Sequence, residues 1–307
     1  MKSHLLFPRY FRPIGFLLAI SGLVLGFLFL FYGILISNFG PPTVQGYDKV
    51  PKIIDNYTNE LALTLVIVGI MFIAFAKLKN EDELIAQLRL NALYWAILVY
   101  YMLLTLVAIA LNVNELFFGF TNMKARFLLK YNLFVPLIAF LIRFYYLLHK
   151  SKDEYFVAPL RFLPYNPFNK IARWIAIPFI ALFIPCFIYG LSSVGYSGPP
   201  PLWVRCSFVS YFILPIILLI WMYSKERVED EYMKSLRLRA MQIAIYINCI
   251  VLLLGNLIFF KFNFIYFELG ELSIMPLIFV VVFQTYLYRA SKSTERKKDH
   301  TLNLKTL

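Results

Sequence analysis

The stretch from Gly15 to Ile36 reads GFLLAISGLVLGFLFLFYGILI and contains no charged side chain. Its length matches the about 20 apolar residues that a helix needs to cross a bilayer. Similar runs recur along the whole chain: about Pro13 to Ile36, Leu61 to Ala76, Ala92 to Leu111, Leu133 to Leu148, Trp174 to Leu191, Cys206 to Tyr223, Ala240 to Phe260 and Leu272 to Tyr288. The sequence therefore predicts an all-α, polytopic transmembrane bundle of about eight helices, in which the short second and fourth runs need not span fully.

The composition excludes a water-soluble domain. Of 307 residues, 61% are hydrophobic and 15% are charged, and the mean hydropathy is +0.70. The net charge of +13 resembles that of a nucleic-acid-binding protein, but the basic residues lie between and beyond the apolar runs. The predicted partner is the lipid bilayer, and we expect no nucleic acid. Because the first run is too long for a signal-peptide core, we expect it to be retained as a helix.

The distribution of basic residues predicts the orientation. If the N-terminus is cytoplasmic and all eight runs cross, 23 of the 30 Lys and Arg residues lie on the cytoplasmic side. The positive-inside rule then places both termini in the cytoplasm. Aromatic residues at the ends of the runs fit the belts that anchor helices at the membrane surface.

Two segments of the chain are strongly similar to each other. Residues 77–97 (KLKNEDELIAQLRLNALYWAI) and 225–245 (KERVEDEYMKSLRLRAMQIAI) share 10 of 21 positions without a gap. This self-similarity indicates an internal repeat. We expect two tandem four-helix repeats in residues 1–150 and 172–290, inserted in parallel. An interfacial connector at 151–171 would join them, and a basic cytoplasmic tail would follow at 291–307.

The repeated pattern E-D-E-x4-L-R-L supplies the candidate site residues: Glu81, Asp82, Glu83, Arg89, Glu229, Asp230, Glu231 and Arg237. Three interpretations remain open. The acidic residues can cap a helix, for instance Asn80 with Glu83, while the arginines pack between the halves. Alternatively, the pattern forms a surface for a cytoplasmic protein partner. Metal or catalytic chemistry is the least favoured because the three histidines are isolated in the sequence.

Arg143 is the only charged residue inside an apolar run. We expect it to reach the cytoplasmic surface or to pair with an acidic residue of the pattern, although an intramembrane charge is also a functional candidate. Aligned on Pro136 and Pro276, its counterpart is Phe283. Asn248 and Asn256 share a helix face and are expected to bond between helices. Cys186 and Cys206 flank one outer loop and could pair, although inert packing is favoured.

Sequence motifs of enzymes and metal sites do not occur, so we expect no catalytic residue, cofactor or metal ligand. A transporter or channel for a small or lipophilic solute is the alternative. Against it, no acidic residue is expected at mid-membrane, and no Gly-rich break recurs in matching helices.

Three stretches together carry a resemblance to known sequences: LLFPRYFRPIGFLLAI at 5–20, NLFVPLIAFLIRF at 132–144, and the repeated E-D-E-x4-L-R-L. Their combination resembles a family of uncharacterised integral membrane proteins from Bacteroidetes bacteria. The resemblance implies an inner-membrane location and provides no catalytic residue. The sequence thus predicts a non-enzymatic membrane protein with a sensory, regulatory or assembly role, and it leaves the oligomeric state open.

Overall fold

The computed structural model describes residues 6–37, 39–40, 56–79, 81–118, 134–151, 160–192, 201–207, 209–227, 229–258 and 262–305. Within these ranges the regular structure is helical, apart from two isolated parallel bridges. Six of the described helices are long and apolar enough to cross a membrane. The chain is therefore a multi-pass helical membrane protein.

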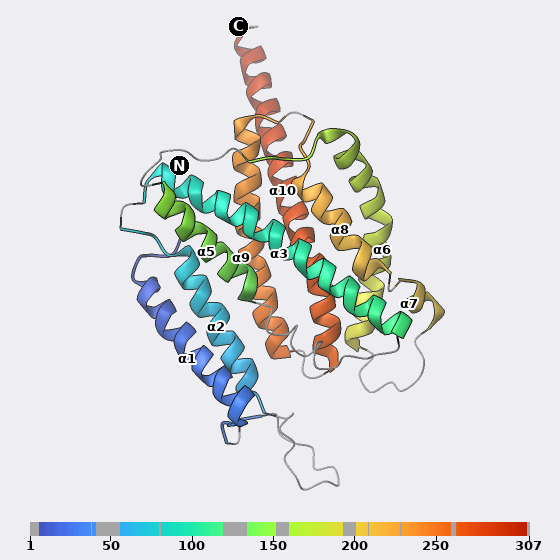
Figure 1. Ribbon diagram of the computed structural model, residues 1–307. Coiled ribbons are helices and arrows are strands. Elements are labelled where there is room, and N and C mark those ends of the chain that lie inside the picture. The colour runs from blue at the N-terminus through green and yellow to red at the C-terminus, as the bar shows by residue number, and fades with distance from the viewer. Residues whose placement is uncertain are drawn as a thin grey trace. The chain divides into compact units, whose positions relative to one another are not determined.

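The helices follow one another along the chain as Figure 1 shows. Their bounds are α1 Phe11–Tyr32, α2 Thr58–Phe75, α3 Glu83–Phe118, α5 Val135–Lys150, α6 Lys170–Ser192, α7 Leu202–Ser207, α8 Ser210–Tyr223, α9 Glu231–Ile258 and α10 Phe262–Lys305. A short π-helical turn, η3 (Tyr165–Asn169), leads into α6.

The lengths of the helices correct one expectation. The second run forms the 18-residue α2, which is long enough to span because it begins at Thr58, earlier than the hydropathy suggested. The fourth run gives the 16-residue α5, and the sixth gives a 14-residue α8 because α7 is separate from it. The short runs are thus the fourth and sixth, and not the second and fourth.

Contacts divide the chain into two compact units. Unit 1 comprises Met1–Ala158, Gly190–Ser197 and Cys249–Glu268, and unit 2 comprises Pro159–Tyr189, Gly198–Asn248 and Leu269–Leu307. Both α9 and α10 therefore contribute one part to each unit.

In unit 1, α1 packs on α2 through small residues. A side chain at Gly69 of α2 would place its Cβ 2.4 Å from the backbone nitrogen of Ala19, and the corresponding distances to α2 carbonyl oxygens are 2.7 Å at Gly15 and 2.8 Å at Gly22 of α1. Small residues let two helix backbones approach closely in a membrane. The opposite face of α1 is exposed and apolar, with Leu17 and Phe31 among its residues, as a lipid-facing helix requires.

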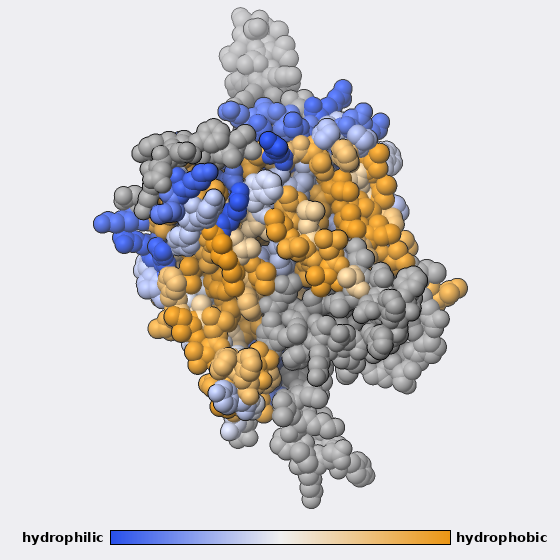
Figure 2. Space-filling view, viewed as in Figure 1, coloured by the Kyte–Doolittle hydropathy of each residue, from blue (hydrophilic) through white to orange (hydrophobic). Residues whose placement is uncertain are grey.

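Aromatic rings fill the interior of both units. In unit 1, Phe140 of α5 stacks on Phe75 of α2 and on Phe144, at 5.5 and 5.8 Å between ring centroids. In unit 2, Phe279 and Phe283 of α10 stack in the same way at 5.5 Å. On the face shown in Figure 2, hydrophobic residues cover the middle of the helices, and hydrophilic residues gather toward helix ends.

The segments expected to lie outside the bundle differ in structure. Residues 160–164 are not helical, in agreement with a connector that is not one continuous helix. By contrast, the helix α10 continues to Lys305, so most of the expected basic tail is helical. Cys186 is a buried free thiol, so the pairing with Cys206 that the sequence allowed does not form.

Candidate functional site

The repeated pattern builds two sites, one in each unit, around a buried arginine. We call them arginine site 1 (Phe7, Ala74, Glu81, Arg89 and Phe144) and arginine site 2 (Leu163, Met222, Glu229, Arg237 and Phe283). Each site lies where a helix hairpin turns, α2 to α3 in unit 1 and α8 to α9 in unit 2. All the contacts described below lie within one unit.

An extended residue from upstream in the chain closes each hairpin. In site 1, the Phe7 amide donates to the Phe75 carbonyl at 2.9 Å, and the Lys77 amide donates back to Phe7 at 3.0 Å. In site 2, Leu163 makes the matching pair with Tyr223 and Lys225, at 2.9 and 2.8 Å. A proline follows the bridging residue in both, and it favours an extended backbone there.

Arg89 occupies the centre of site 1. Its Nη1 donates to the Ala74 carbonyl at 2.8 Å, and its Nη2 lies 3.1 Å from both carboxylate oxygens of Glu81. The guanidinium carbon is 4.7 Å from the centroid of the Phe144 ring. The last carbonyls of a helix lack partners within it and attract cations, so Arg89 completes the C-terminal end of α2.

Arg237 makes closer contacts in site 2. Its Nη1 donates to the carbonyls of Met222 and Ser224 at 2.8 and 2.7 Å, and its Nη2 lies 3.0 Å from Oε2 of Glu229. Two rings contact the guanidinium, those of Phe162 and Phe283, at 4.8 and 4.9 Å. The side chain of Arg237 is 1% exposed, compared with 4% for Arg89.

The carboxylates of the pattern have separate functions. Glu81 also accepts the Leu78 amide at 2.9 Å, and in site 2 Glu229 accepts the Glu226 amide at 2.9 Å. These bonds hold the turn between the two helices. The glutamates, and not the aspartates seven residues before the arginines, form the ion pairs.

The aspartates cap the following helices. Asp82 accepts the Ile85 amide at 2.7 Å, and Asp230 accepts the Met233 amide at 2.7 Å. A side chain at this position satisfies an amide that the first helical turn leaves open. The cap of α3 is thus Asp82, whereas the expected capping residue Asn80 lies outside the described residues. Glu83 and Glu231 begin α3 and α9 and are exposed.

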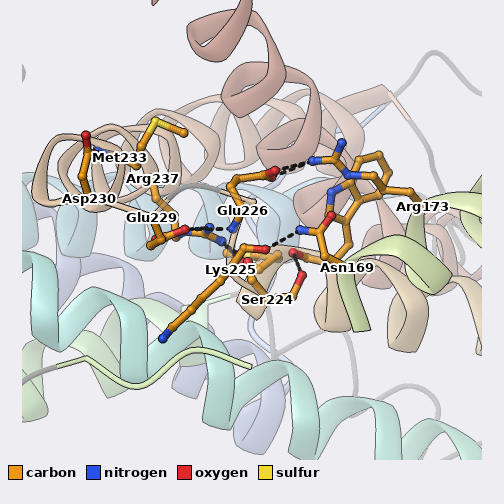
Figure 3. Close-up of polar contacts among 11 residues, drawn as sticks. Asn169, Arg173, Ser224, Lys225, Glu226, Glu229, Asp230, Met233 and Arg237 are labelled. Carbon is orange, nitrogen blue, oxygen red and sulfur yellow. Dashed lines mark hydrogen bonds and ion pairs between the residues drawn. The ribbon is translucent and has the colours of Figure 1, made fainter. Parts of the chain in front are cut away.

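Site 2 contains an additional ion pair, which Figure 3 shows beside Arg237. Arg173 of α6 lies 2.6 and 2.7 Å from the two carboxylate oxygens of Glu226, and it also lies over the ring of Trp221. The Asn169 amide donates to the Lys225 carbonyl at 2.9 Å. In site 1, Leu78 stands where site 2 has Glu226, so this pair has no equivalent there.

The position of Arg143 bears on two expectations. Its guanidinium lies 5.6 Å from the ring of Trp95, and in the described part of the chain it makes no ion pair. Of the two alternatives expected for Arg143, pairing with an acidic residue of the pattern is therefore not found among the described residues. The two ring stacks align Phe144 with Phe283, so the residue that matches Arg143 is Val282 and not Phe283.

A buried acid–amide pair is the feature that the hydropathy of the sequence concealed. Glu271 of α10 accepts a hydrogen bond from the amide nitrogen of Asn248 on α9 at 3.1 Å. Glu271 is 3% exposed and Asn248 is 6% exposed. The last apolar run was expected to begin at Leu272, but α10 begins at Phe262, so Glu271 lies within the helix.

The acid–amide pair also lies deep in the helix hairpin. Asn248 lies about two and a half turns before the end of α9, and Glu271 lies about two and a half turns after the start of α10. Equal distances from adjoining helix ends would have predicted that the two residues face each other. The structure thus places an acidic residue inside a helix that was expected to begin just after it.

The other expected helix-bridging asparagine also forms polar contacts. In unit 1, the amide nitrogen of Asn256 donates to the Glu60 carbonyl at 2.9 Å and to Thr64 at 3.3 Å. Hydrogen bonding between helices is therefore confirmed for both Asn248 and Asn256. Among the described residues, no group of three or more His, Cys, Asp or Glu is placed to hold a metal ion.

Comparisons with protein-family models, with curated proteins and with solved structures return no match. The resemblance of the sequence to bacterial membrane proteins therefore stays a prediction.

Proposed function

We propose that this chain is a non-enzymatic plasma-membrane protein with a sensory, regulatory or assembly role, built as two parallel tandem copies of a four-helix repeat. The observation that carries the proposal is the matching use of the repeated pattern. In both sites, the guanidinium and one glutamate bond to backbone groups of the same hairpin. Groups used in this way hold the fold together and are not presented to a substrate.

The duplication is supported by equivalences that extend well beyond the repeated letters. A constant spacing of 148 residues relates Ala74 to Met222, Glu81 to Glu229, Asp82 to Asp230 and Arg89 to Arg237 in the contacts described above. The bridging residues Phe7 and Leu163 extend the correspondence upstream. Independent sequences do not converge on the same set of backbone partners at the same spacing.

The cytoplasmic orientation rests on the charges around the two sites. Exposed basic residues accompany each hairpin, among them Lys79 in unit 1 and Lys225, Arg227 and Lys234 in unit 2. Basic residues are retained on the cytoplasmic side during insertion. This orientation gives a cytoplasmic partner access to both hairpins.

The positions proposed for a partner are the exposed acids that begin α3 and α9, Glu83 and Glu231. Glu81 and Glu229 lie within the arginine sites, where they pair with the arginines. A regulatory or assembly role therefore predicts a basic partner surface at these positions. It also makes them better positions for crosslinking than Glu81 and Glu229.

Photo-crosslinking in cells tests this role. A photoreactive residue at Glu83 or Glu231 should capture one defined protein, and the same residue at the lipid-facing Leu17 should not. Charge reversal at the unlabelled position, Glu83→Lys or Glu231→Lys, should reduce the yield. Equal crosslinking from all three positions, or none from either glutamate, would contradict the proposed role.

A transporter or channel is a second candidate, and Glu271 is the observation that favours it. Ionisable residues inside a membrane bundle commonly mark ion and substrate pathways. Uptake of a solute into proteoliposomes that Glu271→Gln abolishes would favour this candidate over the first. Equal uptake by wild type and variant would remove its main support.

A further inference from the structure

The acid–amide pair of Glu271 and Asn248 lies inside the membrane-spanning part of unit 2. Asn248 is about three turns beyond Arg237 along α9, or about 16 Å at the rise of an α-helix. The hydrocarbon core of a bilayer is about 30 Å thick. Asn248 and Glu271 both lie within candidate membrane spans, Glu231–Ile258 and Gly270–Lys292.

Apolar side chains of unit 2 pack closely beside the pair. A Cβ added at Gly270 would lie 2.2 Å from the ring of Phe187, so α6 packs directly against α10 one residue before Glu271. Leu272 and Met275 on α10 are also buried. A charge in such a setting is unfavourable unless it is neutralised or well bonded.

One atom of the pair lacks a partner among the described residues. The side-chain oxygen of Asn248 is buried and accepts no hydrogen bond, although its nitrogen donates to Glu271. An ionised carboxylate has only acceptors, so it cannot satisfy a second acceptor. A protonated carboxyl group has an O–H donor.

A primary amide and a neutral carboxyl group can bond reciprocally. The amide N–H donates to the carboxyl C=O, while the carboxyl O–H donates to the amide C=O. This arrangement satisfies the Asn248 oxygen, whereas the ionised form of Glu271 leaves it buried and unsatisfied. An unsatisfied buried polar group costs about 1–3 kcal/mol.

We propose that Glu271 and Asn248 form a proton-binding site in the membrane interior, with the proton on the Glu271 carboxyl group and shared with the Asn248 oxygen. Proton release breaks one of the two hydrogen bonds proposed for this pair. The site thus couples proton uptake to the pairing of these helices, which goes beyond the proposed function and is compatible with either candidate role.

Apart from Glu268, the ionisable groups of the neighbouring described segments are of different chemical types from Glu271. The neighbouring described segments contain thiols and phenols, on α6, α8 and α9: Cys186, Tyr189, Tyr211, Tyr246 and Cys249. Glu268 precedes Glu271 by three residues in the sequence, and the charged groups of site 2 lie about three turns away. Thiols and phenols ordinarily ionise above neutral pH, so a carboxyl signal from this region comes from a glutamate.

At the position that corresponds to Asn248, the described part of unit 1 has a different residue. The spacing of 148 residues that relates the two arginine sites places Tyr100 opposite Asn248, and Tyr100 is buried. The proton-binding site is therefore a feature of unit 2, added to an otherwise shared framework.

Infrared difference spectroscopy tests the proposal on the full chain in phosphatidylcholine vesicles. Wild type should show the carbonyl-stretch band of a protonated carboxyl group at neutral pH, with its intensity lost on alkaline titration. Glu271→Gln should remove this band. Glu60→Gln is the matched control, because Glu60 is also a buried glutamate but lies in unit 1, and it should leave the band in place.

A second variant keeps the test informative if Glu271→Gln folds poorly. Asn248→Ala should shift the band to higher frequency, because the carboxyl group loses its hydrogen-bond partner. A band that Glu271→Gln leaves unchanged would overturn the site. A band that disappears in Glu271→Gln but does not move in Asn248→Ala would overturn the sharing with Asn248.

Discussion

Arginine sites 1 and 2 have the same plan but differ in how completely they enclose the guanidinium. Within the described part of the chain, Arg237 has two carbonyl bonds of 2.8 and 2.7 Å and contacts with the rings of Phe162 and Phe283. The corresponding described contacts of Arg89 include a carbonyl bond of 2.8 Å, a second at 3.5 Å and the ring of Phe144. The glutamate that pairs with Arg237 is also less exposed than the one that pairs with Arg89: the side chain of Glu229 is 6% exposed and that of Glu81 is 11% exposed.

The difference indicates which elements the fold cannot lose. The bonds to backbone carbonyls, the glutamate and one phenylalanine occur in both sites, so they are the minimum for holding a hairpin turn. Among the described residues, the second ring and the Arg173–Glu226 pair are seen in site 2, where they further fix α6 to the turn between α8 and α9. The variants below measure separately the contacts that the two sites share and the contacts that are specific to site 2.

Loss of the arginine in site 2 should have the largest effect. Arg237→Gln removes the cation from a buried ion pair and leaves the Glu229 carboxylate uncompensated, which typically costs about 3–5 kcal/mol. We expect little folded protein by size-exclusion chromatography in detergent. Arg227→Gln in the same turn is the control, since Arg227 is exposed. Folding of Arg237→Gln at the level of this control would contradict a structural function.

The same change in site 1 should have a smaller effect. Arg89→Gln leaves carbonyl oxygens of α2 without a donor, at about 1–3 kcal/mol, but its glutamate is closer to solvent. The expected result is folded protein with a lower melting temperature, with Lys79→Gln as the control. A melting temperature reduced more than that of Arg237→Gln would reverse the comparison.

The helix caps should have moderate and equal effects in both units. Asp82→Ala and Asp230→Ala each remove one cap bond of 2.7 Å, typically worth about 1 kcal/mol. Asp→Asn at either position retains an accepting oxygen and should preserve stability. Thermal unfolding of the four variants measures this, and strongly unequal losses in the two units would show that the aspartates differ in function.

The ion pair unique to site 2 should have the smallest effect. Arg173 is 34% exposed, and pairs this close to solvent contribute about 0.2–1 kcal/mol. Glu226→Gln should therefore lower the melting temperature slightly, and more so at low salt. A loss as large as that of the cap variants at high salt would show that this pair is part of the minimum framework.

The sequence predicted the helices well because apolar runs of membrane length permit few other structures. The repeat also located both arginine sites before their contacts were known. What could not be predicted is which carboxylate pairs with Arg89, since Glu81 and Asp82 are adjacent and only the start of α3 decides which becomes the cap. Glu271 was missed because hydropathy ends a run at a charge, although packing continues the helix past it.

Side-specific labelling tests the central claim, a duplicated chain with both arginine sites on the cytoplasmic side, most directly. Single cysteines replace Lys79 and Arg227 in a chain whose native cysteines, Cys186, Cys206 and Cys249, have been replaced by alanine. A membrane-impermeant maleimide should label both positions in inside-out vesicles and neither in right-side-out vesicles. Labelling of the two positions from opposite sides would contradict the parallel duplication, and labelling of both only from outside would contradict the orientation.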